Sequence, residues 1–124
     1  MTPQQQQTAA AEFAEFWADK GDENQEAQRF WIQLLSEVLG IENPTKRIEF
    51  EKRVKLTHTS YIDAYIPSTK VLIEQKGSKI DLHKAAEQSD GAELTPYQQA
   101  KRYADEMPNS LRPHWIVVCN FQEF

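Results

Sequence analysis

The stretch YIDAYIPSTKVLIEQKG, residues 61–77, decides the fold and raises a question about charge. Tyr, Ile and Val crowd both arms, and the middle is Pro-Ser-Thr-Lys, so the pattern predicts two short β-strands joined by a tight turn. If Ser68 and Thr69 form the loop, Asp63 lies directly opposite Glu74. Two carboxylates side by side in a hairpin repel each other. We therefore expect a positive partner for this pair.

The same register sorts the hairpin side chains onto two faces, because side chains alternate along a strand. The predicted apolar packing face comprises Ile62, Ala64, Ile66, Val71 and Ile73. The predicted polar face comprises Tyr61, Asp63, Tyr65, Leu72, Glu74 and Lys76. A three-residue loop would make Asp63 and Glu74 diagonal neighbours, and the two carboxylates would still lie close together.

The segments before the hairpin predict a tail, helical structure and a strand. Residues 1–11 are polar and Gln-rich, which predicts a disordered tail ahead of a single domain over residues 12–124. A short helix is expected over residues 10–17. Residues 23–41 place apolar side chains at helical spacing and predict a longer helix. In residues 47–56 apolar and charged side chains alternate, which predicts a half-buried strand.

The segments after the hairpin predict one helix and one strand. Residues 78–93 are polar and are typical of one amphipathic turn or of a loop crossing the surface. Thr95 as N-cap, with Gln98 completing a capping box, predicts a helix that Pro108 ends. The apolar run HWIVVCNF, residues 114–121, predicts a strand covered on both faces. The predicted fold class is α/β, a mixed sheet with the order αβββαβ.

Composition and charge restrict the function. The net charge of −5 argues against a strong, sequence-independent grip on nucleic acid, although residues 46–124 alone carry a net charge of +1. The single cysteine, Cys119, excludes a disulfide framework and a CxxC metal site. No signal peptide and no apolar run of membrane length is found, so we expect a cytoplasmic protein without a membrane partner.

A divalent cation is the simplest partner for the two acids. Mg²⁺ prefers carboxylate and carbonyl oxygens and keeps several waters, which two acids and an exposed backbone can provide. A metal-bound water of lowered pKa is a nucleophile toward a phosphodiester. Lys76, two residues after Glu74 on the same face, can orient or deprotonate that water or stabilise the phosphate charge.

Asp63, followed after ten residues by Glu74-Gln75-Lys76 at the end of a hairpin, resembles the D…ExK core of the PD-(D/E)xK nuclease superfamily. Gln99 and Tyr103, at i and i+4 on the next helix, resemble the QxxxY motif of its RecB-like branch. The resemblance implies a restriction-endonuclease-like fold and a Mg²⁺-dependent DNA endonuclease, in which Mn²⁺ can substitute. It implies catalytic roles for these residues and metal binding by Asp63, Glu74 and Gln75. The sequence departs from the motif at Ile62, where the family often has proline.

A wider resemblance covers residues 28–124. This part of the chain is similar to the amino-terminal nuclease region of restriction enzymes fused to an adenine-specific DNA methyltransferase. The resemblance implies an excised domain whose partners are double-stranded DNA and the parent's C-terminal methyltransferase and target-recognition domains. A first-helix glutamate often assists the metal in that family; Glu37 and Glu26 are both candidates, and Glu37 is preferred because it flanks the apolar stripe.

Other interpretations stay open. Asp63, Glu74 and Lys76 could be a solvated cross-strand charge cluster, and Gln99 and Tyr103 a polar residue and a core-edge aromatic. A catalytically silent DNA-binding or scaffold module of a methyltransferase would keep the fold without the chemistry. A repair nuclease of the same fold would differ in the shape of its substrate.

Overall fold

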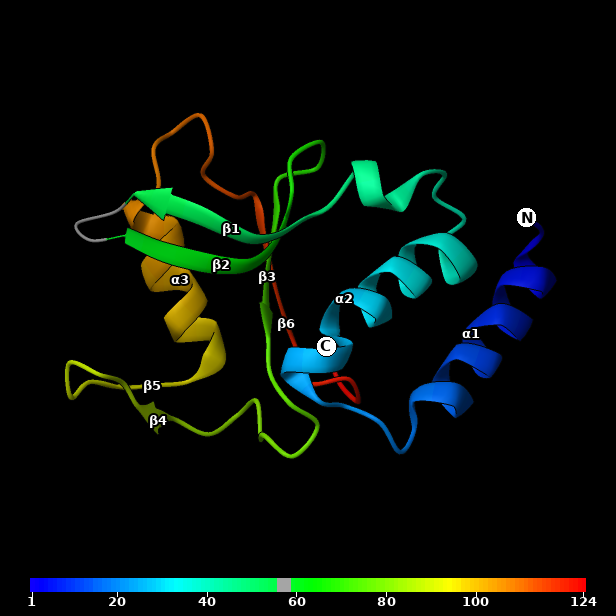
Figure 1. The fold of residues 1–124 in the computed structure, drawn as a ribbon, viewed down its shortest axis with the longest axis horizontal. Coiled ribbons are helices and arrows are strands. Elements are labelled where there is room, and N and C mark those ends of the chain that lie inside the picture. Colours follow the sequence, from blue (N-terminus) through cyan, green and yellow to red (C-terminus); the bar gives the residue numbers. More distant parts are fainter. Residues whose placement is uncertain (56–58) are drawn as a thin grey trace.

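A four-stranded mixed sheet organises the protein in the computed structural model, which describes residues 1–55 and 59–124 (Figure 1). The strand order is β1-β2-β3-β6; the first three strands are antiparallel, and β6 runs parallel to β3. The strands are β1 (Glu49–Lys55), β2 (Thr59–Ile66), β3 (Val71–Gln75), β4 (Ala86–Glu87), β5 (Glu93–Leu94) and β6 (Trp115–Cys119). The helical elements are α1 (Pro3–Trp17), α2 (Glu23–Gln33), α3 (Pro96–Glu106), the π-helical turn η1 (Leu34–Val38) and the 3₁₀ turn η2 (Pro44–Lys46).

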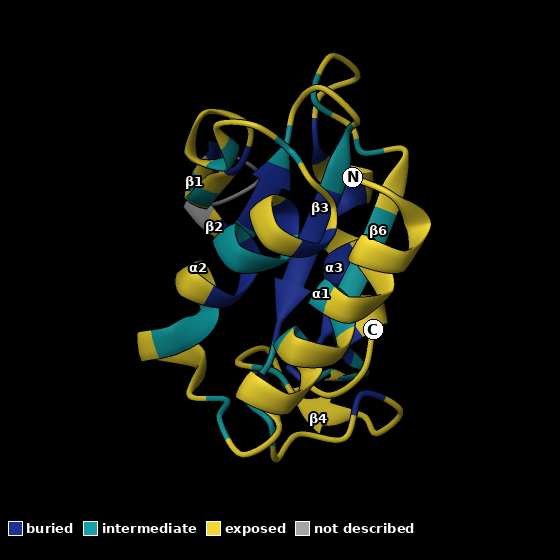
Figure 2. Ribbon diagram, turned by 90° about the vertical axis from the view of Figure 1, so that its right-hand side faces the viewer, coloured by how far each residue is buried: buried dark blue, intermediate teal, exposed yellow. Residues whose placement is uncertain are grey.

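Helices cover both faces of the sheet, and each face has its own hydrophobic cluster. α2 lies on one face with α1 outside it, and α3 lies on the other face (Figure 1). The first cluster joins α1, α2 and the sheet through Trp17, Phe30, Trp31, Leu35, Ile48, Ala64, Ile73, Cys119 and Phe121. The second cluster joins α3 and the sheet through Val54, Ile62, Tyr65, Leu72, Ala100 and Met107. The middle of the sheet is therefore the most deeply buried part of the chain (Figure 2).

The hairpin has the predicted register. Ala64 pairs with Ile73 and Ile66 with Val71, as a loop of residues 68 and 69 requires. The Lys70 N–H donates to the Pro67 carbonyl across the turn at 3.4 Å. If this pairing is continued by one residue beyond Ala64 and Ile73, Asp63 lies opposite Glu74.

The predicted division of the hairpin into an apolar and a polar face is wrong in two respects. Ile62 packs in the second cluster rather than beside Ala64 in the first. The alternation changes at Glu51, whose φ is 49° and whose pair with Asp63 is missing from the β1–β2 ladder. In addition, Tyr65 is buried under α3 and is not on an open polar face.

Residues 3–11 are helical, whereas the sequence predicts a disordered tail there. α1 begins at Pro3 with a capping box between Thr2 and Gln5. Gln and Ala have good helix propensity, so the composition that suggested a tail also supports a helix once its first turn is capped. The predicted long helix over residues 23–41 is divided into α2 and η1.

The predicted αβββαβ order is not confirmed as such. The short helix expected over residues 10–17 is part of the longer α1, and the polar segment after the hairpin contains the short paired strands β4 and β5. The predicted capping box of α3 is confirmed, with Thr95 accepting from the Gln98 N–H at 3.2 Å. The final strand is also found, but it forms an edge of the sheet, and Trp115 is 67% exposed instead of covered.

Candidate active site at the end of the hairpin

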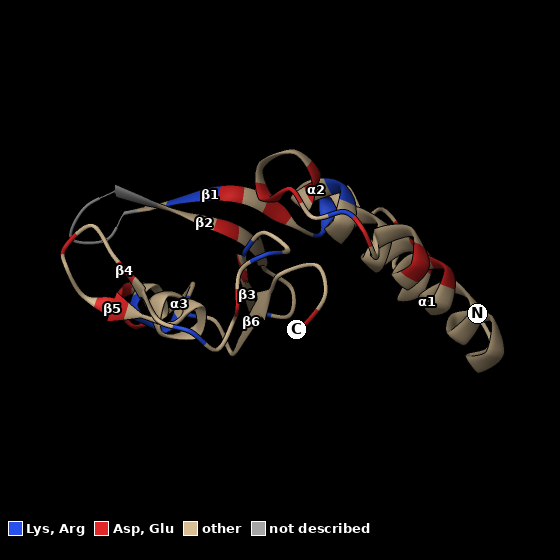
Figure 3. Ribbon diagram, turned by 90° about the horizontal axis from the view of Figure 1, so that it is seen from below, with Lys and Arg blue, Asp and Glu red and all other residues tan. Residues whose placement is uncertain are grey.

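The structure brings Asp63, Glu74 and Lys76 together near the end of β3 that lies away from the hairpin turn. The Lys76 amine lies 3.3 Å from a Glu74 carboxylate oxygen. Asp63 accepts a hydrogen bond from the Gln75 backbone N–H at 2.8 Å, which holds its carboxylate beside β3. Acidic positions occur on all three neighbouring strands β1, β2 and β3 (Figure 3). Lys76 supplies one positive charge beside Glu74, and the divalent cation stays a prediction.

The electrostatics of the carboxylates show that this counter-charge is incomplete. Burial, and then the neighbouring charge of Asp63, raise the pKa of Glu74 to about 7, although Lys76 opposes the shift. Glu74 is only 5% exposed. Burial also raises the pKa of Asp63, against the opposing effects of the Gln75 N–H and Lys76. One lysine does not neutralise the buried Glu74 and the half-buried Asp63 together, so this site favours a further positive charge.

Gln99 connects α3 to the site. Its side-chain oxygen accepts a hydrogen bond from the Lys76 amine at 3.1 Å, so the lysine is held between Glu74 and Gln99. Tyr103 is half-buried one turn further along α3. It lines a neighbouring cavity of about 280 Å³ with Gln99 and Arg102. The two residues of the QxxxY pattern therefore lie on one side of α3, with Gln99 nearer to the carboxylates.

The side chain of Gln75 has a structural role. Its amide oxygen accepts from the Trp31 indole N–H at 2.6 Å, and its amide nitrogen donates to the Lys76 carbonyl at 2.9 Å. The contact with Trp31 is buried and the contact with the Lys76 carbonyl is part-buried, so the side-chain amide is already committed. A role of Gln75 in metal binding would have to use its main chain.

Neither of the two helix glutamates predicted from the sequence, Glu37 and Glu26, lies at the carboxylate pair in the structure. Glu37 is exposed on η1, and Glu26 accepts from the backbone N–H groups of Gly21 and Asp22 at the start of α2. Glu23, in the first turn of α2, is instead the helix residue near the site. Burial and the charge of Asp63 raise the pKa of Glu23. Sequence reasoning missed Glu23 because an acid in a first helical turn is also explained by the helix dipole.

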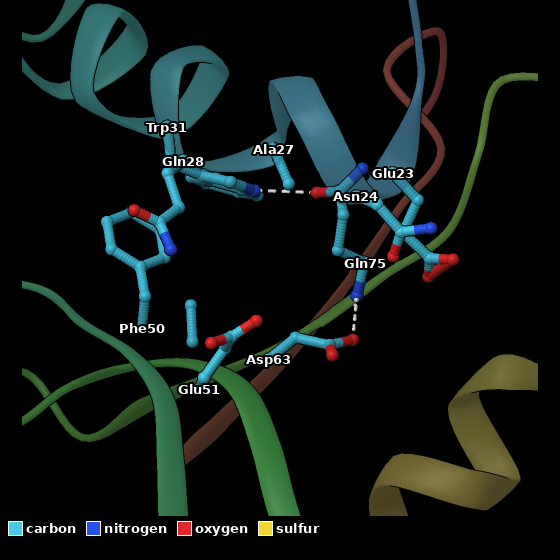
Figure 4. Close-up of a pocket in the computed structure, with 10 residues that line it drawn as sticks. Glu23, Asn24, Ala27, Gln28, Trp31, Phe50, Glu51, Asp63 and Gln75 are labelled. Carbon is cyan, nitrogen blue, oxygen red and sulfur yellow. Dashed lines mark hydrogen bonds between the residues drawn. The ribbon is translucent and has the colours of Figure 1, made fainter.

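A cavity of about 210 Å³ opens between α2 and the hairpin beside these residues (Figure 4). Three acids, Glu23, Glu51 and Asp63, face it from α2, β1 and β2. No lysine or arginine lines it among the described residues, and Trp31 and Phe50 form its apolar wall. The cavity gives solvent-sized molecules access to Asp63 from the α2 side.

The donor set suits a hard divalent ion. Asp63 and Glu74 supply carboxylate oxygens with unsatisfied charge, as Mg²⁺ prefers. Within residues 1–55 and 59–124, no three His, Cys, Asp or Glu side chains are already gathered as a ready-made ligand set, so main-chain oxygen and water would complete the shell. The Cys119 thiol is buried, and burial raises its pKa to about 11, which disfavours the thiolate form.

Sheet and site together define a mixed α/β domain with a carboxylate pair and a lysine at the end of a β-hairpin. The chain belongs to the family described as "MmeI, N-terminal domain", whose model matches residues 8–124. No curated protein and no solved structure matches the chain. Among the described residues, the helices are too short or too polar to span a membrane.

Proposed function

We propose that this domain is a Mg²⁺-dependent DNA endonuclease that hydrolyses phosphodiester bonds as part of a restriction-modification enzyme. The observation that carries the proposal is the position of the Lys76 amine between Glu74 and Gln99, beside a second, half-buried carboxylate from Asp63. Membership of the MmeI N-terminal domain family supports the restriction-modification context. The proposed partners are double-stranded DNA and the methyltransferase and target-recognition domains of a longer parent chain.

The D…ExK hairpin, the following α3 and the parallel β6 support a restriction-endonuclease-like core. Asp63, Glu74 and the main chain of Gln75 would hold the metal. When bound, the ion supplies Lewis-acid charge and a water of lowered pKa. Mn²⁺, which accepts the same oxygen ligands, would substitute.

The protein's own groups have separate tasks in this proposal. The Gln75 N–H fixes the Asp63 carboxylate in place. The Lys76 amine orients the attacking water or neutralises charge on the phosphate oxygens, since an ammonium is a mobile donor of three hydrogen bonds. Gln99 keeps the amine directed at the site. Glu23, which lines the same cavity from α2, would accept a proton or hold a water molecule there.

The decisive experiment is cleavage of plasmid DNA by the parent protein with Mg²⁺, beside its Lys76→Ala and Glu74→Gln variants. Loss of a general acid–base or charge-stabilising group typically costs about 10²–10⁴-fold in rate, and we expect a loss of this size for each variant. Lys79→Ala is the matched control, because Lys79 is an exposed lysine three residues further on. Cleavage that is unchanged in the two site variants would show that the cluster is only structural. DNA binding without cleavage by the wild type would favour a silent module.

A further inference from the structure

The side chain of Gln75, between the two site residues at the end of the hairpin, belongs to the opposite face of the sheet. Side chains alternate along a strand, so Glu74 and Lys76 share one face and Gln75 faces the other. The Lys76 amine reaches Gln99 of α3. Gln75 instead contacts Trp31 of α2. Because Gln75 is only 2% exposed, its polar side chain depends on partners in the α2 layer.

Three elements hold the main chain at residue 75. The Gln75 N–H donates to Asp63 of β2, and its side-chain oxygen accepts from the Trp31 indole N–H, as the dashed lines in Figure 4 show. Its side-chain nitrogen donates to the Lys76 carbonyl. The Lys76 N–H donates to the Cys119 carbonyl of β6 at 2.7 Å. The peptide between Gln75 and Lys76 is therefore fixed from β2, α2 and β6 together.

The bond between Trp31 and Gln75 determines an orientation more than it adds stability. Trp31 is 6% exposed and belongs to the first hydrophobic cluster, where its indole N–H needs an acceptor. Two apolar side chains of the same shape would be about as stable as this polar pair, whereas either partner alone leaves a costly unpaired group. The pair therefore holds the Gln75 amide in one orientation within an otherwise apolar layer.

We propose that Trp31 is a positioning residue of the candidate active site. Its indole N–H orients the Gln75 side chain, which fixes the main chain between Glu74 and Lys76. The Gln75 N–H in turn holds the Asp63 carboxylate, so the indole acts on the site through two hydrogen bonds in series. Groups that orient metal ligands commonly change metal affinity tenfold or more. The inference rests on the proposed endonuclease function, because it gives Trp31 a task in that site.

A second tryptophan provides a matched control. The Trp17 indole N–H donates to the Gln33 side-chain oxygen at 2.8 Å, and Trp17 packs in the same hydrophobic cluster as Trp31. This bond involves no residue of the hairpin. Trp17→Phe therefore removes an indole hydrogen bond and core volume without changing the contacts of residue 75. If Trp31 only fills the core, Trp31→Phe and Trp17→Phe should behave alike.

The first measurement is amide hydrogen exchange by NMR on the 124-residue protein without metal. Trp31→Phe leaves the Gln75 side-chain oxygen without its donor, which favours local opening. We expect the Gln75 and Lys76 amides to exchange at least about fivefold faster relative to the amide of Leu72, a fully buried residue of the same strand. Trp17→Phe is expected to leave this ratio at its wild-type value, because a loss of global stability accelerates both kinds of amide.

The second measurement is a double-mutant cycle read by calorimetric titration with Mn²⁺. Trp31→Phe and Gln75→Met should each weaken Mn²⁺ binding about tenfold, and Trp17→Phe should not. Gln75→Met keeps the volume of the side chain and the main-chain N–H, so the contact of that N–H with Asp63 loses only its support. If Trp31 acts through Gln75, the double variant binds about as well as either single variant. Independent effects would multiply to about a hundredfold loss.

The outcomes separate this inference from the endonuclease proposal. An exchange ratio that Trp31→Phe and Trp17→Phe leave equally unchanged would overturn the positioning role, and so would multiplying losses in the cycle. Should Trp31→Phe fail to fold, Gln75→Met breaks the same bond, and the exchange of its Lys76 amide gives the same test. A wild type that binds no Mn²⁺ would count against the endonuclease proposal. The exchange ratio is measured without metal and still decides whether Trp31 fixes residue 75.

Discussion

At the scale of single residues, the site is defined by an imbalance of charge. Asp63 and Glu74 are held together by the hairpin register, and Lys76 supplies one positive charge beside Glu74. Burial makes this imbalance costly, because an ionised carboxylate loses its hydration. The close approach of these carboxylates therefore costs folding free energy, which a neighbouring positive charge would reduce.

Glu74 gives a pH dependence of stability with a defined sign. Its pKa is raised from 4.5 to about 7 in the folded protein, so the folded state binds its proton more tightly than the unfolded state does. The stability contribution is full below pH 4.5 and is lost as the pH rises through about 7. Urea unfolding with a chelator present should show the wild type losing on the order of 3 kcal/mol relative to Glu74→Gln over this range. Parallel pH profiles for the two proteins would contradict the raised pKa.

Metal affinity should separate the residues at the site from those predicted only from the sequence. In calorimetric titration with Mn²⁺, Asp63→Ala and Glu74→Ala should weaken binding at least about tenfold, because each removes an ionic ligand. Glu23→Gln should weaken it less, since Glu23 acts from the opposite wall of the cavity. Glu37→Gln is the control and should leave the titration unchanged. A larger effect at Glu37 than at Glu23 would reverse our assignment of the helix glutamate.

At the scale of elements, the sequence predicted correctly those features that neighbouring residues determine. The turn fixes the hairpin register, so the closeness of Asp63 and Glu74 is predictable from the sequence alone. The capping box at Thr95 is equally local and is confirmed. The position of Glu23 depends instead on how α2 packs over the sheet, which no neighbouring residues encode. The edge position of β6 also depends on the topology, because an apolar run looks the same at an edge or in the centre of a sheet.

The cap of α3 can be tested independently of the chemistry. Thr95→Ala removes the acceptor for the Gln98 N–H and should cost about 1 kcal/mol in the free energy of unfolding, whereas Thr95→Ser should be nearly neutral. Since α3 carries Gln99, fraying of its first turn should also lower cleavage by the parent protein modestly. Denaturant unfolding of both variants measures the first effect. An equal loss for Ala and Ser would show that the cap hydrogen bond is not the cause.

At the scale of the whole molecule, α1 is joined to the domain mainly through its C-terminal half. Trp17 is 1% exposed and packs against Phe30 and Phe121, and its indole N–H donates to Gln33 at 2.8 Å. The first turns are mostly exposed, although Gln6 donates to the Val38 carbonyl. The domain thus extends at least as far back as Trp17, while the residues before it contribute less.

Truncation should reveal this gradient. Trp17→Ala should cost about 3–5 kcal/mol, as expected for a large aromatic side chain removed from a core. Deletion of residues 1–11 should cost only about 1 kcal/mol, because it removes few buried contacts. Thermal and denaturant unfolding of both proteins give the comparison. A truncated protein as unstable as the Trp17 variant would mean that the whole of α1 belongs to the core.

The left-handed residue in β1 has a consequence for how the protein melts. Because the strand pair changes sides at Glu51, one hairpin contributes Ala64 to the cluster under α2 and Ile62 to the cluster under α3. Neither helical layer can detach without exposing side chains from strands that the other layer needs. We therefore expect a single heat-absorption peak in scanning calorimetry, with van't Hoff and calorimetric enthalpies in a ratio of about one. Two resolved peaks would show that the layers unfold separately.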